Sequence, residues 1–122
     1  MGMSMNKLVY LASPYSAYKG GRWEAFELVS RRAAGLMLSG NLVFCPIAHS
    51  HSIEMEGMSE KQDGDWWLRQ DFAVLERCDE VWVYMMPGWK ESYGVQAEID
   101  FALAHNIPVY YLAWDQEEKE AA

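Results

Sequence analysis

The chain has 122 residues, of which 51% are hydrophobic, so it is long enough for one domain with a modest core and too apolar to be disordered. Its net charge of -8 and the absence of a long Lys/Arg stripe argue against a nucleic-acid polymer as partner, although a small anionic ligand needs only a local group of donors. No apolar run approaches the roughly 20 residues that cross a bilayer, no signal pattern is visible and the two cysteines are far apart, so we expect a cytoplasmic protein with no membrane partner.

The first half of the chain alternates short apolar runs with one amphipathic segment. Lys7–Ser13 and Asn41–Pro46 are apolar runs that predict strands. Arg22–Ser39 is predicted to be a helix that Gly40 ends, with an apolar stripe made of Trp23, Phe26, Val29, Ala33 and Met37. Ile47–Gln62 has weak periodicity, and we expect either a long loop or a short helix there.

The second half continues the same alternation. Asp63–Arg77 and Gly94–His105 are predicted helices, and Asp63 or Asp65 is the expected cap of the first. Their apolar positions are Trp67, Leu68, Phe72, Leu75 and Cys78 in the first, and Val95, Ile99 and Ala102 in the second. The strands predicted in this half are Glu80–Met86 and Ile107–Ala113.

The order of these elements predicts a single α/β domain over residues 1–122, with flexible ends at residues 1–6 and 115–122. We expect a flavodoxin- or Rossmann-like parallel sheet of four to five strands with helices on both faces. Ligands of such sheets bind beyond the carboxyl ends of the strands, where the strand order reverses. This places the loops Pro14–Gly21 and Pro87–Tyr93 at the expected site.

The strongest chemical signal lies between Asp71 and Glu98, and it ends in Ser92-x-Gly94-Val95-x-x-Glu98. Ser92 is placed to cap the helix that follows it, and Gly94 lets a ligand approach the backbone closely. The start of this helix offers N–H groups to an anion. Glu98 lies about one turn into the helix, so it can face the two ligand loops.

Three motifs occur in order along the chain: Tyr10-Leu11-Ala12-Ser13-Pro14-Tyr15, the spacing from Asp71 to Asp79, and Ser92-x-Gly94-Val95-x-x-Glu98. Together they resemble the nucleoside 2-deoxyribosyltransferase superfamily, which includes the deoxynucleoside 5′-monophosphate N-glycosidases. The resemblance implies a nucleoside or nucleotide substrate and no metal or other cofactor. The roles it implies are nucleophile for Glu98, protonation or holding of the leaving base for Asp71, contact with a 5′-phosphate for Ser92, and lining of the base and sugar for Tyr10, Ser13 and Tyr15.

The residue types suit cleavage of an N-glycosidic bond. One carboxylate attacks or stabilises an oxocarbenium-like centre, and an acid protonates the leaving group. Glu98 has to be ionised to attack, whereas Asp71 needs a raised pKa to act as an acid near neutral pH.

Plainer interpretations compete with these roles. Glu98 and Asp71 are also acceptable as charges on helix surfaces, and Ser92 as a helix cap alone. Asp79, just before a strand, is more readily explained by structure. The chain also departs from the family at its acidic end, because some transferases use their terminal carboxylate in the site.

His49 and His51 flank Ser50 after the second predicted strand. Together with Asp63 or Asp65 they offer metal-ligating atoms, but no third ligand has a recognisable spacing. A contact with substrate or with a neighbouring subunit is the preferred interpretation. One of the adjacent Trp66 and Trp67 is expected to pack in the core, and the other is available to stack on a base.

Two alternative functions remain open. Pro87-Gly88 and Gly94-Val95-x-x-Glu98 resemble the P-G-G-x-G-T-x-x-E loop of cytokinin-activating phosphoribohydrolases, although Trp89 replaces the second glycine. A non-catalytic nucleotide sensor would keep the pocket without turnover. Six Trp and seven Tyr in a short chain also favour a homo-oligomer, since such rings are common at subunit interfaces.

Overall fold

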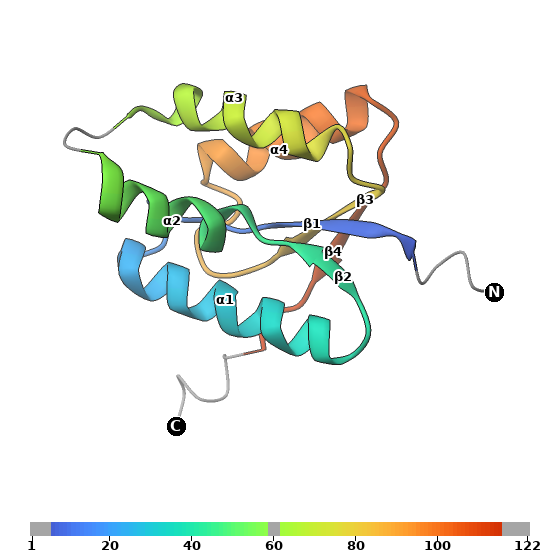
Figure 1. The fold of residues 1–122 in the computed structure, drawn as a ribbon, viewed down its shortest axis with the longest axis horizontal. Coiled ribbons are helices and arrows are strands. Elements are labelled where there is room, and N and C mark those ends of the chain that lie inside the picture. Colours follow the sequence, from blue (N-terminus) through green and yellow to red (C-terminus); the bar gives the residue numbers. More distant parts are fainter. Residues whose placement is uncertain (1–5, 59–61, 116–122) are drawn as a thin grey trace.

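The fold is a four-stranded parallel sheet in a computed structural model that describes residues 6–58 and 62–115. The strands are β1 (Leu8–Ala12), β2 (Leu42–Phe44), β3 (Glu80–Tyr84) and β4 (Val109–Leu112), in the order β2-β1-β3-β4 (Figure 1). The predicted α/β class and parallel sheet are therefore confirmed, with four strands. The ends predicted to be flexible lie outside the described residues, apart from Asn6 and Asp115.

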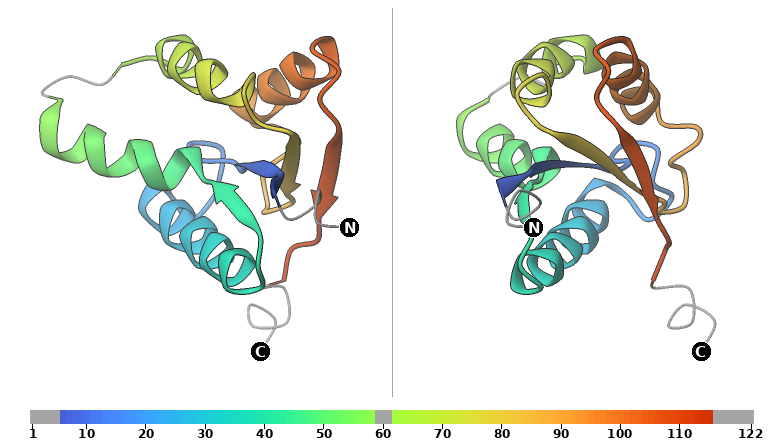
Figure 2. Two further views of the ribbon diagram at one scale, coloured as in Figure 1. Left: turned by 45° about the vertical axis from the view of Figure 1, so that its right-hand side comes forward. Right: turned by 90° about the vertical axis from the view of Figure 1, so that its right-hand side faces the viewer.

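Helices cover both faces of the sheet, as predicted. Helix α1 (Arg22–Leu38) lies on one face, and α3 (Gly64–Leu75) and α4 (Tyr93–Ala104) lie side by side on the other (Figures 1 and 2). Within the segment 47–62, which the sequence left open between a loop and a helix, residues 47–57 form most of α2 (Pro46–Gly57), which packs beside α1, and residues 59–61 lie outside the described residues. Pro46 stands in the first turn of α2, where its missing N–H costs no helical hydrogen bond.

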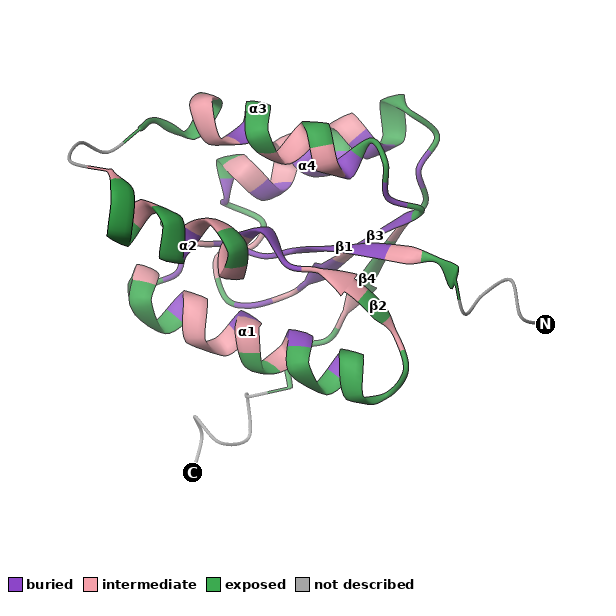
Figure 3. Ribbon diagram, in the orientation of Figure 1, coloured by how far each residue is buried: buried purple, intermediate pink, exposed green. Residues whose placement is uncertain are grey.

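The core is divided by the sheet into two clusters, because successive strand residues point to opposite faces. Tyr10 and Ala12 of β1 join the cluster under α3 and α4, while Leu11 joins the cluster under α1. Buried positions concentrate in β1 and β3, the two central strands (Figure 3). The two edge strands, β2 and β4, contain no fully buried residue.

The buried stripe of α1 differs from the predicted one. Its buried residues are Ala25, Val29, Ala33 and Leu36, whereas the predicted Trp23 and Met37 are 58% and 49% exposed. The predicted and the observed series share Val29 and Ala33. The buried face of the helix is therefore turned relative to the predicted face, and these two positions belong to both. Ala25 and Ala33 thus take up buried positions, while Trp23 and Met37 lie on the exposed side of the helix.

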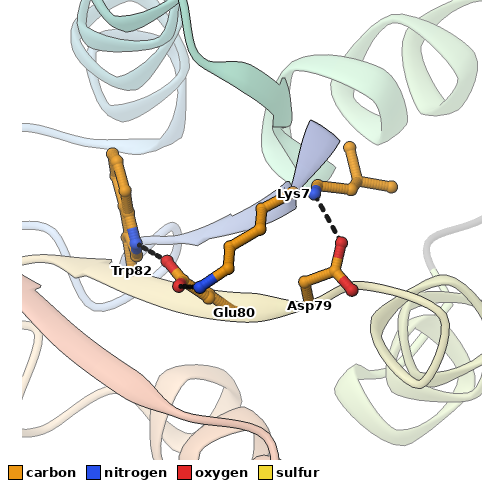
Figure 4. Close-up of polar contacts among 5 residues, drawn as sticks. Lys7, Asp79, Glu80 and Trp82 are labelled. Carbon is orange, nitrogen blue, oxygen red and sulfur yellow. Dashed lines mark hydrogen bonds and ion pairs between the residues drawn. The ribbon is translucent and has the colours of Figure 1, made fainter. Parts of the chain in front are cut away.

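Polar contacts at the amino-terminal end of β1 and β3 fix how these two strands align (Figure 4). The N–H of Leu8 donates to Asp79 Oδ2 at 2.7 Å, and the N–H of Asp79 donates to the Leu8 carbonyl at 2.8 Å. Glu80 is buried and receives hydrogen bonds from Lys7 Nζ at 3.0 Å and from Trp82 Nε1 at 2.9 Å. Asp79 thus has the structural role that the sequence favours.

Strand order reverses between β1 and β3, so the loops that follow these strands meet at the opposite end of the sheet. Gly88 lies at the point where these two loops contact each other. Its φ of +95° favours glycine, and a Cβ at this position would lie 2.5 Å from the carbonyl oxygen of Ala17 in the β1–α1 loop. The two loops therefore contact each other through bare backbone.

We predict that Gly88→Ala lowers the free energy of unfolding by about 2 kcal/mol or more, because it adds backbone strain and a backbone clash. The matched control is Gly35→Ala in α1, where a Cβ meets nothing within 4 Å. That substitution is expected to be neutral or to stabilise by up to about 1 kcal/mol. Urea denaturation monitored by circular dichroism compares the variants, and equal midpoints for Gly88→Ala and wild type would contradict the prediction.

Candidate active site

A cavity of about 200 Å³ lies at the carboxyl edge of the sheet, where the first turns of several helices converge. It is bounded by the β1–α1 loop and by residues of α1, α2, α3 and α4. Six of the predicted site residues line it: Ser13, Tyr15, Asp71, Ser92, Gly94 and Glu98. The seventh, Tyr10, is not on the wall.

Tyr10 lies behind the cavity, where it is completely buried. It is an inward residue of β1 on the face covered by α3 and α4, and its hydroxyl donates a hydrogen bond to Glu98 Oε2. This differs from the expected contact with a substrate. Because side chains alternate between the two faces along β1, Tyr10 lies beneath Glu98 and contacts the Glu98 carboxyl group.

Glu98 is only 5% exposed, in the second turn of α4. Burial raises the pKa of this carboxyl to about 8; the hydrogen bond from Tyr10 opposes the rise, and the nearby Asp71 charge adds to it. Burial also raises the pKa of Asp71, on α3, to about 7. Both carboxyl groups therefore hold their protons to higher pH than an exposed Asp or Glu does.

Ser92 and Gly94 shape the start of α4 at the cavity wall. The N–H of Val95 donates to Ser92 Oγ at 3.2 Å, so Ser92 caps the helix, as the sequence predicts, while also lining the cavity. A Cβ on Gly94 would meet only Ser92 Oγ, at 3.9 Å. The backbone of the first turn is therefore uncovered beside the cavity.

The opposite wall is aromatic and centred on His51 of α2. Its Nδ1 shares a hydrogen bond of 2.7 Å with the hydroxyl of Tyr15, and its ring stacks on Phe26 at 4.1 Å. The rings of Trp23 and His51 meet edge-on, with 5.0 Å between their centroids. The guanidinium of Arg22 lies 5.6 Å from the centre of the Tyr15 ring.

Two buried polar atoms of cavity-lining residues lack partners. Within the described part of the chain, neither Ser13 Oγ nor His51 Nε2 has a hydrogen-bond partner, and both residues are 5% exposed. A buried polar atom without a partner costs free energy, so the chain itself does not meet the hydrogen-bonding needs of these two side chains.

The possible metal ligands are engaged elsewhere. His51 is bonded to Tyr15, Asp63 caps α3 by accepting from the N–H of Trp66 at 2.8 Å, and Asp65 accepts from Tyr93 at 2.8 Å. His49 is exposed, with its ring 5.5 Å from that of Phe44. Residues 6–58 and 62–115 contain no group of three or more His, Cys, Asp or Glu that could hold a metal ion.

The residues that line the cavity but are absent from the predicted set include Arg22, Glu54 and Trp67. Arg22 could have been found as the first residue of a helix that follows the β1 loop. Glu54 could not, because the sequence did not define α2. Trp67 is the member of its tryptophan pair that reaches the cavity, and its ring lies 5.0 Å from that of Trp66.

Only the end of the loop after β3 reaches the cavity. Ser92 lines it, whereas Pro87–Glu91 borders a separate hollow beside Trp114. Trp89 lies against Tyr111 with 5.5 Å between ring centroids. The loop therefore leaves the cavity open.

The fold and the cavity define a Rossmann-like α/β protein with a paired-carboxyl site at the carboxyl edge of its sheet. The chain belongs to the family described as "Domain of unknown function (DUF1937)", whose model matches residues 7–114. No curated protein matches the chain. None of the helices in the described ranges is long and apolar enough to cross a membrane.

The raised pKa values predict how stability depends on pH. The pKa values of Glu98 and Asp71 rise on folding from 4.5 to about 8 and from 3.8 to about 7, so the folded chain binds more protons than the unfolded chain across this interval. Stability from these groups is fully present below about pH 4 and is lost as the pH rises through about 7 to 8.

We therefore predict that Glu98→Gln reduces the loss of melting temperature between about pH 5 and about pH 8 relative to wild type. The control is Glu91→Gln, at an exposed position of the neighbouring loop. Thermal melts followed by circular dichroism measure the difference. A pH dependence unchanged by Glu98→Gln, or equally changed by Glu91→Gln, would show that Glu98 is not the group responsible.

Proposed function

We propose that this protein cleaves or transfers the N-glycosidic bond of a nucleoside or nucleoside 5′-monophosphate, with Glu98 as the nucleophile and Asp71 as the acid. The observation that carries the proposal is that a buried carboxyl group, Glu98, and a partly buried one, Asp71, lie on one cavity wall, with a tyrosine hydroxyl hydrogen-bonded to Glu98. The sequence resemblance to nucleoside 2-deoxyribosyltransferases supports the same reaction.

In the proposed first step, a carboxylate oxygen of Glu98 attacks the anomeric carbon of the sugar. The carbon–nitrogen bond breaks, its electron pair goes to the base, and the proton of Asp71 neutralises that base. Glu98 is left as a sugar ester. The cavity wall of α3 and α4 presents both carboxyl groups to the same space, as this step requires.

In the second step, water or another base attacks the same carbon and breaks the ester bond. Asp71 takes the proton of the attacking group, and the Glu98 carboxylate is regenerated. Water as the attacking group gives hydrolysis, and an acceptor base gives transfer.

The reactive arrangement requires a proton on Asp71 and a negative charge on Glu98. Burial raises the pKa of Glu98 to about 8 and that of Asp71 to about 7, so further interactions are needed to keep Glu98 ionised. The hydrogen bond from Tyr10 favours the ionised form of Glu98. A cationic sugar in the transition state would favour it further.

The phosphoribohydrolase alternative has less support. Its Pro87-Gly88 segment does not line the cavity, and Gly88 packs against the backbone of Ala17 instead. The sensor alternative is distinguished by turnover, because a sensor would bind nucleotides without releasing base.

We predict that wild type releases free base from at least one member of a panel of nucleosides and 5′-monophosphates, assayed with and without an acceptor base. Glu98→Gln should lower the rate by about 1,000-fold or more, and Asp71→Asn by about 100-fold or more, mainly in kcat. Chromatography measures the base, and mass spectrometry after an acid quench detects a sugar ester on the peptide that contains Glu98.

The matched control for both variants is Asp100→Asn, an exposed position on the same helix as Glu98, which should keep the wild-type rate. No base release from any substrate, with nucleotides still binding to folded protein, would favour the sensor. Full activity in Glu98→Gln would exclude the nucleophile assigned here.

We also infer that the chain forms a homo-oligomer. Edge strand β4 pairs with β3 on one side, and it leaves Tyr110 and Tyr111 exposed by 52% and 48%. Unpaired edges that carry large apolar rings are favourable places for association. Light scattering at micromolar concentration is expected to give a multiple of the chain mass, and a monomer would contradict this.

A further inference from the structure

The cavity has two chemically different walls. The wall formed by α3 and α4 carries Asp71 and Glu98. The wall formed by the β1–α1 loop, α1 and α2 carries Tyr15, Arg22 and His51. The first wall thus carries two carboxyl groups, whereas the second carries the guanidinium of Arg22 together with the carboxyl group of Glu54.

Arg22 is the only Lys or Arg among the described residues that line this cavity. It forms no ion pair with Glu54 or with any other carboxylate in the described ranges. Its guanidinium instead makes a cation–π contact with the ring of Tyr15. A partly buried guanidinium without an anionic partner has its planar set of N–H donors available for a ligand.

Two other residues of the cavity wall also carry a polar atom without a hydrogen-bond partner within the described chain. His51, bonded to Tyr15 through Nδ1, is 95% buried and has no hydrogen bond at Nε2 within the described chain. Ser13 Oγ, directly after β1, likewise has no hydrogen-bond partner within the described chain. These are two buried polar side chains of the cavity wall whose hydrogen-bonding needs the chain itself does not meet.

A phosphate group entering this cavity faces an unfavourable charge. The chain has a net charge of -8, and Glu54, Asp71 and Glu98 all line the same space. Ser92 and the first N–H groups of α4 offer only partial positive charges. A full positive charge is needed as well, and Arg22 is the residue in place to supply it.

We propose that Arg22 is the specificity-determining residue that makes this site select nucleoside 5′-monophosphates over nucleosides, by pairing with the phosphate. This rests on the proposed function, and it adds the substrate class and the residue that selects it. An arginine binds phosphate through two parallel hydrogen bonds, so both its charge and its planar shape contribute.

Binding to Glu98→Gln protein tests the proposal without turnover. Isothermal titration compares the common ribo- and deoxyribonucleoside 5′-monophosphates, the matching nucleosides and inorganic phosphate. We expect the best monophosphate to bind at least about tenfold more tightly than its nucleoside. Adding Arg22→Gln should abolish this advantage while leaving the nucleoside affinity within about twofold, and Arg22→Lys should retain part of the advantage.

The matched control is Arg31→Gln, which removes an exposed arginine from the same helix and should change neither affinity. Circular dichroism confirms that each variant is folded. Equal affinities of nucleoside and monophosphate, or an equal loss of both in Arg22→Gln, would overturn the proposal. So would a loss of the monophosphate advantage in Arg31→Gln.

The outcome also separates this inference from the proposed function. If wild type releases no base and no nucleoside binds, the proposed function fails, and inorganic phosphate decides the role of Arg22. Phosphate binding that disappears in Arg22→Gln would then support an anion site, whereas absent or unchanged phosphate binding would overturn it.

Discussion

The burial of the Glu98 carboxyl group is the constraint on which the site depends. A carboxyl group placed among apolar side chains is unfavourable unless it is hydrogen-bonded or protonated, and here both conditions contribute. The bond from Tyr10 requires β1 to present its even-numbered residues to α4. The alignment of the central strand and the rotation of α4 are therefore both tied to one polar contact in the core.

The parallel sheet explains why so many polar groups meet in one place. Every strand ends at the same edge, so the helices that follow begin there and direct their free N–H groups toward the same space. The contact of Gly88 with Ala17 holds together the two loops that flank the reversal of strand order. Polar contacts at the other end of β1 and β3, around Asp79 and Glu80, keep the two strands aligned.

The two walls of the cavity offer different chemical groups to a substrate. The α3 and α4 wall holds two carboxyl groups with raised pKa values, which suits a reaction that needs one acid and one base. The wall centred on Tyr15, Arg22 and His51 offers charge and unsatisfied donors or acceptors. A substrate with a reactive sugar and an anionic group would contact both walls.

The sequence by itself determined the order of the strands and of all helices except α2, the class of the fold and most of the residues of the candidate site, because these depend on local patterns. Apolar runs define parallel strands, Ser92 is a local cap, and the 3.6-residue period places Val95 and Ile99 inward. Tertiary structure alone decided what depends on packing between distant elements. It turned α1 toward Ala25 and Leu36, placed Tyr10 behind Glu98, and made α2 a cavity wall with His51 in it. The role of Arg22 likewise follows from which charges surround it in space, and that arrangement arises only when four helices meet at one edge of the sheet.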